Sequence, residues 1–444
     1  MQIKSTVSYE DFGAVGDGKT DDFDAIARAH AYANENGLDV VCASGKTYYI
    51  GNASLNDEKP KPAAKIKTNV NWGDAKFIID DSEIEVDMPA RVGSLFCVEH
   101  DFAPTVYTVE NDTPNGAIKR INDEGGFSHN ITKLDIGIGY PAMLTVINEE
   151  RRVYIRYGAN AGGGNPQSEI INVDAEGNID AKTAFLLDYA KVTKISVIRQ
   201  DKPITLKGGT FITVANKAME DYKYYHRNII ISRTDVTVDG LTYKIIGEGE
   251  HGDPYAGFLT IAHSSNVVLK DCKLQAHKYY WCVGSGGGAP VGMGTYGVNI
   301  ASSNNVLFKN CIQTNFFADD GKSYRSGIWG ILCSDYSKNL VYEDSVLSRF
   351  DAHTGVVNAR VSNSTLAGFR IIGGGEMTVE NCLVYGDVLI AIREDYGSTW
   401  KGELTIKDVT LRNTKTPSVI YALWSNHYFG YDTYLPETVI IDNL

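Results

Sequence analysis

A short pattern of alternating apolar and polar residues recurs through the C-terminal half of the chain. Seven copies align at residues 235–240, 266–272, 305–311, 339–345, 359–364, 376–382 and 403–409. In most copies, as in Asn305-Val-Leu-Phe-Lys-Asn-Cys311, a short alternating strand ends in a polar residue and then a small one. Alternation gives each strand one buried face, and a strand this short is stable only when its neighbours stack on it. The repeat therefore predicts an all-β solenoid built of stacked coils.

A second row of apolar segments precedes the first row in the coils. Its members are Phe258-Leu-Thr-Ile, Val298-Asn-Ile, Ile328-Trp-Gly-Ile-Leu, Phe369-Arg-Ile-Ile and Leu389-Ile-Ala-Ile. In such a stack the small residues that end each repeat lie one above the other, about 4.8 Å apart. We therefore expect Cys272 and Cys311 on the same rung of successive coils, and Cys382 on that rung further along.

The N-terminal segment has the residues of a short amphipathic helix. It begins Tyr9-Glu-Asp-Phe-Gly-Ala-Val-Gly-Asp-Gly-Lys-Thr-Asp-Asp, and apolar residues then recur at helical spacing up to Gly37. This segment, together with Gly45-Lys-Thr-Tyr-Tyr-Ile, resembles the N-terminal cap of the pectate-lyase superfamily. The resemblance implies a single-stranded right-handed parallel β-helix closed by a capping α-helix. The cap is shared by lyases, polygalacturonase-like hydrolases and phage tailspikes, so that it does not assign a reaction.

The two patterns divide the chain into three parts. Residues 1–85 are expected to form the cap helix and the first coils, and residues 191–444 the main β-helix with the active-site groove. Residues 86–190 break the coil pattern with longer strand-like stretches and glycine-rich loops, and we interpret them as a β-rich insertion or subdomain beside the solenoid.

Charge and composition narrow the classes of partner. The chain of 444 residues has a formal net charge of −13, which argues against a nucleic-acid partner because phosphate binding needs clustered Lys and Arg. No apolar run approaches the roughly 20 residues that cross a bilayer, and the first residues lack the apolar core of a signal peptide. We expect no membrane partner, and a chain that is cytoplasmic as written or secreted with its leader removed. The exposed flanks of a solenoid would allow a homo-trimer.

Cysteine usage predicts neither a disulfide framework nor a metal site. The seven cysteines form no CxxC pair and show no zinc spacing. We expect reduced, buried thiols, and no cofactor. Acidic loops would suit Ca²⁺, but no motif specifies it.

Candidate catalytic residues follow the small residue of three neighbouring repeats. Because a β-helix buries its interior, the reacting groups must line up on an outer face. The residues that we expect there are His277, Asn315, Arg349, Asp351 and His353, with Tyr324 added from a nearby loop. The alternative is that Arg349 and Asp351 form a structural pair and that His353 caps a turn.

Candidate substrate-binding residues lie in four segments. A glycine-rich excursion carries aromatic rings that suit sugar stacking, and two charged turns and one acidic turn could also reach the groove. These residues are Tyr280, Trp281, Tyr296, Asp320, Arg325, Arg393, Asp395, Tyr396 and His251.

The residue types favour cleavage of an acidic polysaccharide or oligosaccharide. In a lyase, a uronic-acid carboxylate is neutralised, a base removes the C5 proton and an acid protonates the leaving oxygen. Arg349 and Asn315 would bind the carboxylate and His353 or His277 would be the base. Tyr280 or Tyr324 would be the acid.

Two other classes remain open. A glycoside hydrolase would need two carboxyl groups, for which Asp351 with Asp320, Glu394 or Asp395 are the candidates. The pattern of polygalacturonases is not matched, because no Gly-His-Gly or Arg-Ile-Lys follows the paired aspartates. A tailspike-type or other non-catalytic protein would bind the glycan and leave it intact.

Overall fold

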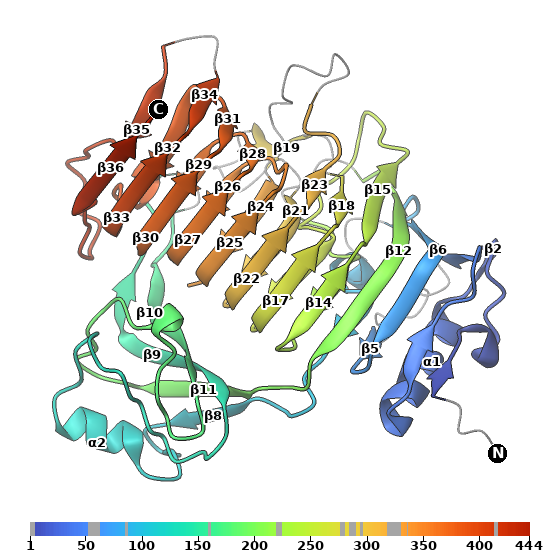
Figure 1. The fold of residues 1–444 in the computed structure, drawn as a ribbon, viewed down its shortest axis with the longest axis horizontal. Helices are drawn as coiled ribbons and strands as arrows, with labels where there is room; N and C mark the ends of the chain where they lie inside the picture. The colour runs from blue at the N-terminus through green and yellow to red at the C-terminus, as the bar shows by residue number, and fades with distance from the viewer. Residues whose placement is uncertain are drawn as a thin grey trace.

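Three rows of short parallel strands run along the length of the molecule and give it an elongated shape (Figure 1). The structure is a computed structural model. It describes residues 5–51, 63–84, 88–158, 161–218, 224–275, 280–283, 290–293, 296–317, 330–334, 336–412 and 416–444. Each coil passes through the three rows in turn, so that the chain forms a parallel β-helix of the right-handed type expected from the N-terminal segment.

The first row is a ten-stranded parallel sheet. Its strands are β5 (Ala64–Ile66), β7 (Phe96–Val98), β13 (Ile229–Ile231), β16 (Leu259–Ala262), β21 (Tyr296–Ala301), β24 (Gly330–Ser334), β26 (Phe350–Ala352), β29 (Phe369–Ile371), β32 (Val388–Ile392) and β35 (Ser418–Tyr421). It contains the apolar segments predicted to precede the repeat. Strand β26, between β24 and β29, was not among them.

The second row holds the repeat that the sequence shows most clearly. Its strands are β1 (Thr6–Val7), β3 (Asp39–Val41), the first halves of β6 (Val70–Asp80) and β12 (Ile204–Val214), β14 (Val236–Asp239), β17 (Ser265–Lys270), β22 (Asn304–Lys309), β25 (Lys338–Glu343), β27 (Val356–Ser362), β30 (Gly373–Glu380), β33 (Trp400–Lys407) and β36 (Thr438–Asp442).

A third row follows the second and was not predicted. It consists of β2 (Asp17–Asp21), β4 (Thr47–Ile50), the second halves of β6 and β12, β15 (Thr242–Ile246), β18 (Lys273–Leu274), β23 (Ile312–Gln313), β28 (Thr365–Leu366), β31 (Leu383–Tyr385) and β34 (Thr410–Arg412). Several of these strands have only two or three residues, too few to show an alternating pattern.

The corner between the second and third rows explains the polar-small ending of the repeat. The polar residue adopts a left-handed backbone, with φ of 48–56° at Asp271, Asn310, Asp344, Asn363, Asn381 and Asp408. Asn and Asp tolerate this conformation better than other non-glycine residues. The next residue turns inward, where Cys272, Cys311 and Cys382 are all buried. These thiols are free. The pairing of Lys273 with Ile312, the residues that follow two of them, places Cys272 and Cys311 on the same rung of successive coils, as predicted.

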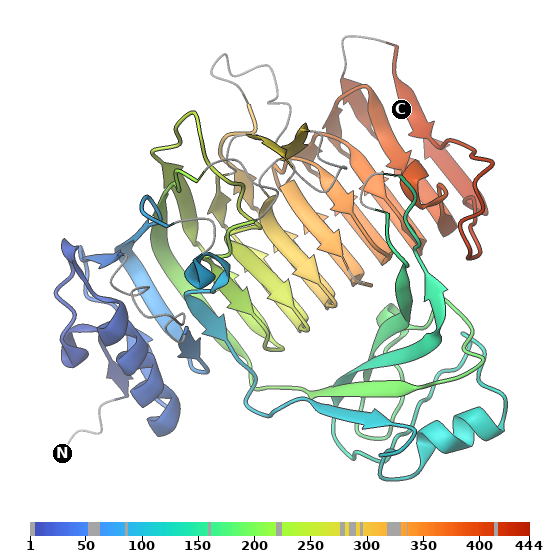
Figure 2. The same ribbon diagram turned by 180° about the vertical axis from the view of Figure 1, so that it is seen from behind.

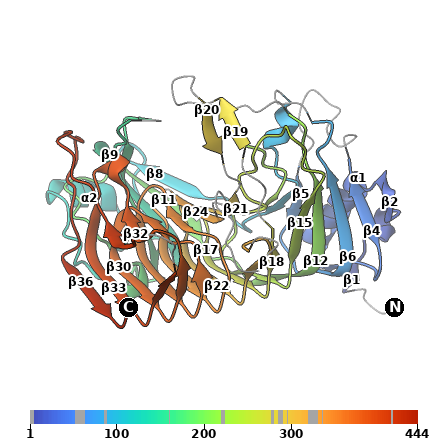
Figure 3. The ribbon, with the colours of Figure 1, turned by 90° about the horizontal axis from the view of Figure 1, so that it is seen from above.

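The N-terminal end of the β-helix is closed by α1 (Phe23–Asn36), as expected. The helix buries Phe23, Ile26 and His30, and Gly37 ends it with a left-handed φ of 64°. Short 3₁₀ helices are η1 (Glu10–Phe12), η3 (Pro89–Val92), η4 (Ala181–Thr183) and η5 (Glu394–Tyr396). In Figure 3, β19 (Tyr280–Val283) and β20 (Pro290–Met293) stand off from the solenoid as an antiparallel pair. Within the described residues, no helix is long and apolar enough to cross a membrane.

A separate antiparallel sheet projects from one side of the solenoid. It is made of β8 (Thr105–Thr108), β9 (Ala142–Val153), β10 (Asn165–Val173) and β11 (Lys194–Arg199), and it packs with α2 (Ala117–Asp123) around its own apolar core. Two strands fall on the other side of the boundaries proposed from sequence. Strand β7 lies within 86–190 but belongs to the first row, whereas β11 lies beyond residue 190 but belongs to the insertion. Phe96-Cys-Val is too short to show the coil pattern.

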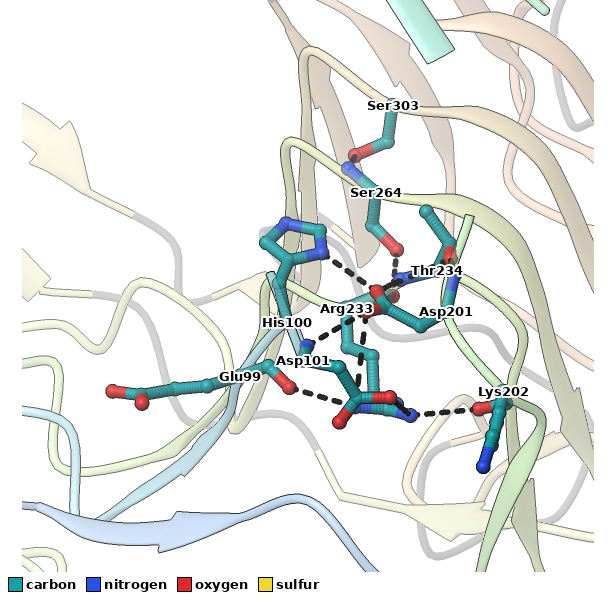
Figure 4. A network of polar contacts seen from close by, with 9 residues as sticks. All are labelled: Glu99, His100, Asp101, Asp201, Lys202, Arg233, Thr234, Ser264 and Ser303. Carbon is teal, nitrogen blue, oxygen red and sulfur yellow. Dashed lines mark hydrogen bonds and ion pairs between the residues drawn. The ribbon is translucent and has the colours of Figure 1, made fainter. Parts of the chain in front are cut away.

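The two chain segments at the root of the insertion are tied to the solenoid by one polar network (Figure 4). Arg233 donates to both oxygens of Asp101, at 2.7 and 2.6 Å, and to the backbone oxygens of Glu99 and Lys202. Asp201 accepts from Thr234 and contacts His100 at 2.8 Å. Arg233 is buried, and therefore fixes the direction in which the insertion leaves the first coils.

The other end of the insertion reaches the C-terminal coils (Figure 2). Past the end of β9, Tyr154 packs with Ile372, Tyr396 and the partly buried Tyr431 in a small apolar cluster. The insertion thus touches the solenoid at both of its ends.

Candidate functional site

The outward face of the first row carries a charged patch near the C-terminal end. Strand register places Leu332, Asp351, Arg370, Ala391 and Tyr421 side by side on five successive strands. The alternation that turns the side chain of Asp351 outward turns those of Phe350 and Ala352 into the core.

Four of these residues, Asp351, Arg370, Ala391 and Tyr421, line a pocket of about 350 Å³, named here the arginine pocket. Three of its arginines come from successive coils and the fourth from the insertion, just past the end of β9. The lining residues are Arg156, Arg349, Asp351, Arg370, Ala391, Ile392, Arg393, Glu394, Asp395 and Tyr421. Two larger cavities, of about 440 and 730 Å³, lie where the insertion meets the early coils. Four arginines against three carboxylates make the arginine pocket locally basic in a chain of net charge −13.

Asp351 is buried at the base of the pocket between two arginines. Arg349 Nε lies 3.2 Å from Asp351 Oδ2, and Nη2 of the same guanidinium donates to that oxygen as well. Arg393 Nη1 lies 3.6 Å from Oδ1, which accepts no hydrogen bond from the described residues. Burial alone would raise the pKa of Asp351, but the charges of Arg349 and Arg393 outweigh it and lower that pKa. Asp351 is therefore ionised at neutral pH.

Asp395 is held in a second ion-pair system. Arg393 donates to its two oxygens at 3.1 and 2.8 Å, and Arg156 Nε lies 2.8 Å from Oδ2. Burial opposes ionisation, but the hydrogen bond and charge of Arg393 lower the pKa of Asp395. The guanidinium carbons of Arg393 and Arg156 lie 5.2 and 5.7 Å from the ring centre of Tyr396. The aromatic ring helps to hold both arginines in place.

Arg370 differs from the other three arginines. Its side chain is exposed, and no carboxylate of the described residues forms an ion pair with it. Partial burial and the positive charges of Arg349 and Arg393 lower the pKa of Arg370. An anion that binds next to Arg370 would offset the repulsion from the neighbouring arginines. The planar guanidinium group can also donate two parallel hydrogen bonds to a carboxylate.

His353 lies beside the pocket and does not line it. Its half-buried ring meets the edge of Tyr396, with 6.4 Å between ring centres. Burial, followed by the charge of Arg393, lowers the pKa of His353 to about 4. The imidazole is therefore neutral at pH 7, and the lowered pKa also makes it a weaker base than an exposed histidine.

The structure brings six of the predicted site residues together. They are Arg349, Asp351, His353, Arg393, Asp395 and Tyr396. Tyr296 is buried at the start of β21, and burial and the negative charge of Asp351 raise its pKa.

The remaining predicted residues lie elsewhere or outside the description. Asn315 follows β23 and His251 lies in an exposed segment after β15, and neither lines the pocket. Tyr280 and Trp281 are on β19, where only the backbone is described. His277, Asp320, Tyr324 and Arg325 lie outside the described residues.

Sequence reasoning missed two arginines and one tyrosine that line the pocket. Arg370 had a usable signal, because it is the outward residue of the predicted strand Phe369-Arg-Ile-Ile. Tyr421 lies on the short strand β35, beyond the last aligned repeat. No sequence pattern could have identified Arg156, because it reaches the pocket only when the insertion packs against the C-terminal coils.

No cation site is visible in the part of the chain that the structure describes. There, no group of three or more His, Cys, Asp or Glu side chains is placed to hold a metal ion.

Comparison with solved structures shows the same fold. The tailspike protein gp49 from Pseudomonas phage LKA1 is similar over 98% of this chain and 77% of its own, with 13% identity and a TM-score of 0.51. The tailspike Gp54 of Acinetobacter baumannii bacteriophage AP22, solved with capsular saccharide, gives 10% identity, coverages of 99% and 69%, and a TM-score of 0.47. An endo-xylogalacturonan hydrolase from Aspergillus tubingensis gives 12% identity, coverages of 98% and 100%, and a TM-score of 0.42.

These likenesses concern architecture. No protein-family model and no curated protein matches the sequence. The right-handed parallel β-helix predicted from the cap and the repeat is confirmed.

Proposed function

We propose that the protein is carbohydrate-active and binds an acidic polysaccharide across the first strand row, which it cleaves by β-elimination. The observation that carries this proposal is Arg370, an exposed guanidinium without an ion-pair partner among the described residues, in a pocket where the other three arginines contact aspartates. A uronate carboxylate is the anion that this arrangement suits in a polysaccharide. The resemblance of the N-terminal cap to the pectate-lyase superfamily supports the same class of ligand.

In β-elimination, arginines assist the removal of the proton by neutralising the uronate carboxylate. A proton next to a carboxylate is removed more easily when the negative charge of that carboxylate is neutralised. In this proposal Arg370 and Arg349 contact the uronate carboxylate. His353, neutral at pH 7, accepts the C5 proton, whereas Asp351 is held by two arginines and is a poor base. Tyr280 or Tyr324 remains the predicted acid.

Two of the candidate carboxyl groups, Asp351 and Asp395, do not suit the acid of a glycoside hydrolase. Hydrolysis needs one carboxyl group that is protonated when the sugar binds, which requires a raised pKa. The pKa values of Asp351 and Asp395 are both lowered by arginines. Neither residue can therefore serve as the acid at neutral pH.

Binding without cleavage is the second candidate. It is favoured by two observations, that His353 does not line the pocket and that Asp351 and Asp395 are both held in ion pairs. A tailspike-type glycan binder would use the same arginine pocket.

The test combines two assays on a panel of polygalacturonate, alginate, hyaluronan and a neutral glucan. Elimination creates unsaturated uronates that absorb ultraviolet light, and hydrolysis creates reducing ends without that absorbance. We expect absorbance with an acidic member of the panel, and loss of at least 90% of the rate in Arg370→Ala. Arg360→Ala, which removes an exposed arginine on β27 in the second row, should keep the wild-type rate.

The other outcomes discriminate among the classes. Reducing ends without absorbance would contradict elimination. Binding of an acidic glycan without any product would favour the second candidate. An Arg370→Ala variant with unchanged binding and rate would contradict the role of the pocket itself.

A further inference from the structure

Beside the arginine pocket, the insertion and the C-terminal segment place two rings against each other. Tyr157, past the end of β9, stacks on His427, which follows β35, with 3.7 Å between ring centres and 25° between ring planes. Phe429 meets the edges of both rings, at 6.4 Å from Tyr157 and 4.9 Å from His427. We name Tyr157 and His427 the aromatic ledge.

The ledge adjoins the pocket wall. Tyr157 directly follows Arg156, which lines the pocket, and its backbone N–H donates to the backbone oxygen of Asp395 at 2.8 Å. Tyr421, another lining residue, begins the segment that leads to His427. A sugar chain with one residue in the pocket therefore has the ledge beside it.

The ledge is also held firmly. Arg151 Nη2 lies 3.1 Å from Asp432 Oδ2, and Tyr431 donates to the backbone oxygen of Tyr396. The first contact joins the insertion to the C-terminal segment, and the second joins that segment to η5 of the solenoid. A ring fixed before binding costs little conformational entropy when a ligand arrives.

The exposure of Tyr157 is the second argument. His427 covers one face of its ring, yet 54% of the residue remains exposed to solvent. The same C-terminal segment carries Trp424 and Tyr428, each 87% exposed. Exposed aromatic side chains close to a polar pocket are typical of a binding surface.

From these observations we infer that the aromatic ledge is a second saccharide subsite, where the apolar face of a pyranose ring packs on Tyr157. This subsite binds a sugar unit that neighbours, along the polysaccharide, the unit whose carboxylate lies in the arginine pocket. The inference rests on the proposed binding of an acidic polysaccharide, and it adds the direction of the chain, from Arg370 toward the C-terminal segment.

The experiment measures affinity as a function of oligosaccharide length. The probes are di- and hexasaccharides of polygalacturonate and of alginate, titrated calorimetrically into wild-type protein and variants. We expect Tyr157→Ala to weaken hexasaccharide binding three- to tenfold while disaccharide binding changes less than twofold. Tyr157→Phe, which keeps the ring, should bind as wild type does.

Two controls separate this inference from the proposal on which it rests. Tyr32→Ala removes an exposed tyrosine of α1 that also contacts an aromatic ring, and it should leave both affinities unchanged. Arg370→Ala should weaken binding of both lengths. Equal effects of Tyr157→Ala on the two lengths, or no effect, would overturn the ledge while leaving the pocket intact. Unchanged binding in Arg370→Ala, or no binding of any probe, would overturn the pocket and the ledge together. Thermal unfolding confirms that each variant is folded.

Discussion

Lys338 on β25 of the solenoid and Glu169 on β10 of the insertion form a buried ion pair. Lys338 Nζ lies 2.9 Å from Glu169 Oε2, and the two side chains are 0% and 3% exposed. Lys338 also donates to the backbone oxygens of Thr183 and Ala184, and Glu169 accepts from the backbone of Leu186 and Leu187. The pair thus joins two parts of the chain that have separate cores.

Removing one member of this pair should destabilise the protein strongly. Lys338→Met leaves a buried carboxylate without its cation, a change that costs about 3–5 kcal/mol. The double variant Lys338→Met/Glu169→Gln should lose less stability than the sum of the single variants. Equilibrium unfolding in urea measures each value, and strict additivity would contradict the coupling.

The asparagine ladder at the corner between the first and second rows gives a second prediction. Asn305 donates to Asn266 at 3.0 Å and accepts from Asn339 at 2.7 Å, with a left-handed φ of 52°. Asn305→Ala loses both hydrogen bonds and must hold alanine in a strained backbone, whereas Asn305→Gly loses the bonds alone. We expect alanine to be about 1 kcal/mol more destabilising than glycine, by thermal or urea unfolding. The reverse order would show that the backbone relaxes.

Stability should fall on mild acidification because of the buried His30 and the half-buried His353. Burial lowers the pKa of His353 to about 4 and that of His30 to about 3, below the roughly 6.5 of an unfolded chain. Between these values the unfolded state binds more protons than the folded state, so that stability is lost as the pH falls from about 6.5 toward 4. Each histidine contributes at most about 1.4 kcal/mol per pH unit.

The contribution of His353 to this pH dependence can be measured with a His353→Gln variant. Urea unfolding at several pH values should give a shallower slope between pH 6.5 and 4 for His353→Gln than for the wild type. Asp351 and Asp395 act in the same direction but only below about pH 4, because their pKa values are lowered from an ordinary value near 3.9. An unchanged slope would mean that His353 is not buried as a neutral ring.

The proposed reaction has a pH dependence of its own. If His353 is the base, the rate should stay constant as the pH falls through 6.5 and should decline only near pH 4. His353→Ala should lose at least 90% of the rate while binding of an acidic hexasaccharide changes little. A rate that halves near pH 6.5 would point to another base, with His277 as the next candidate.

The repeat could be predicted because its corners impose a local requirement. A left-handed corner selects Asn or Asp, and the narrow interior beyond it selects Cys, Ser or another small residue, so that pairs such as Asp271-Cys272 and Asn310-Cys311 recur visibly. The third row could not be predicted, since β18 and β23 have two residues each. Strand β26 was missed because it has only three residues and the charged Asp351, which points outward, stands at its centre.

Only part of the candidate site on the solenoid was predicted. Arg349 and Asp351 follow the small residue of one repeat and Arg393 follows a predicted strand, so that these three could be placed from the sequence, whereas Arg370 and Tyr421 were missed although both lie on solenoid strands. Arg156 and Tyr157 reach the same place only because β9 is long enough to carry the insertion to the C-terminal coils. No local pattern encodes a contact of this kind.

The double attachment of the insertion has a mechanical consequence. In a simple solenoid each coil touches only its neighbours, and unfolding can begin at one end and proceed coil by coil. Here the insertion contacts Arg233 near the first coils, Lys338 further along the stack and Asp395 near its C-terminal end. Coils that do not touch each other must then come apart together, so that a force applied to the C-terminal end is borne by the N-terminal coils as well.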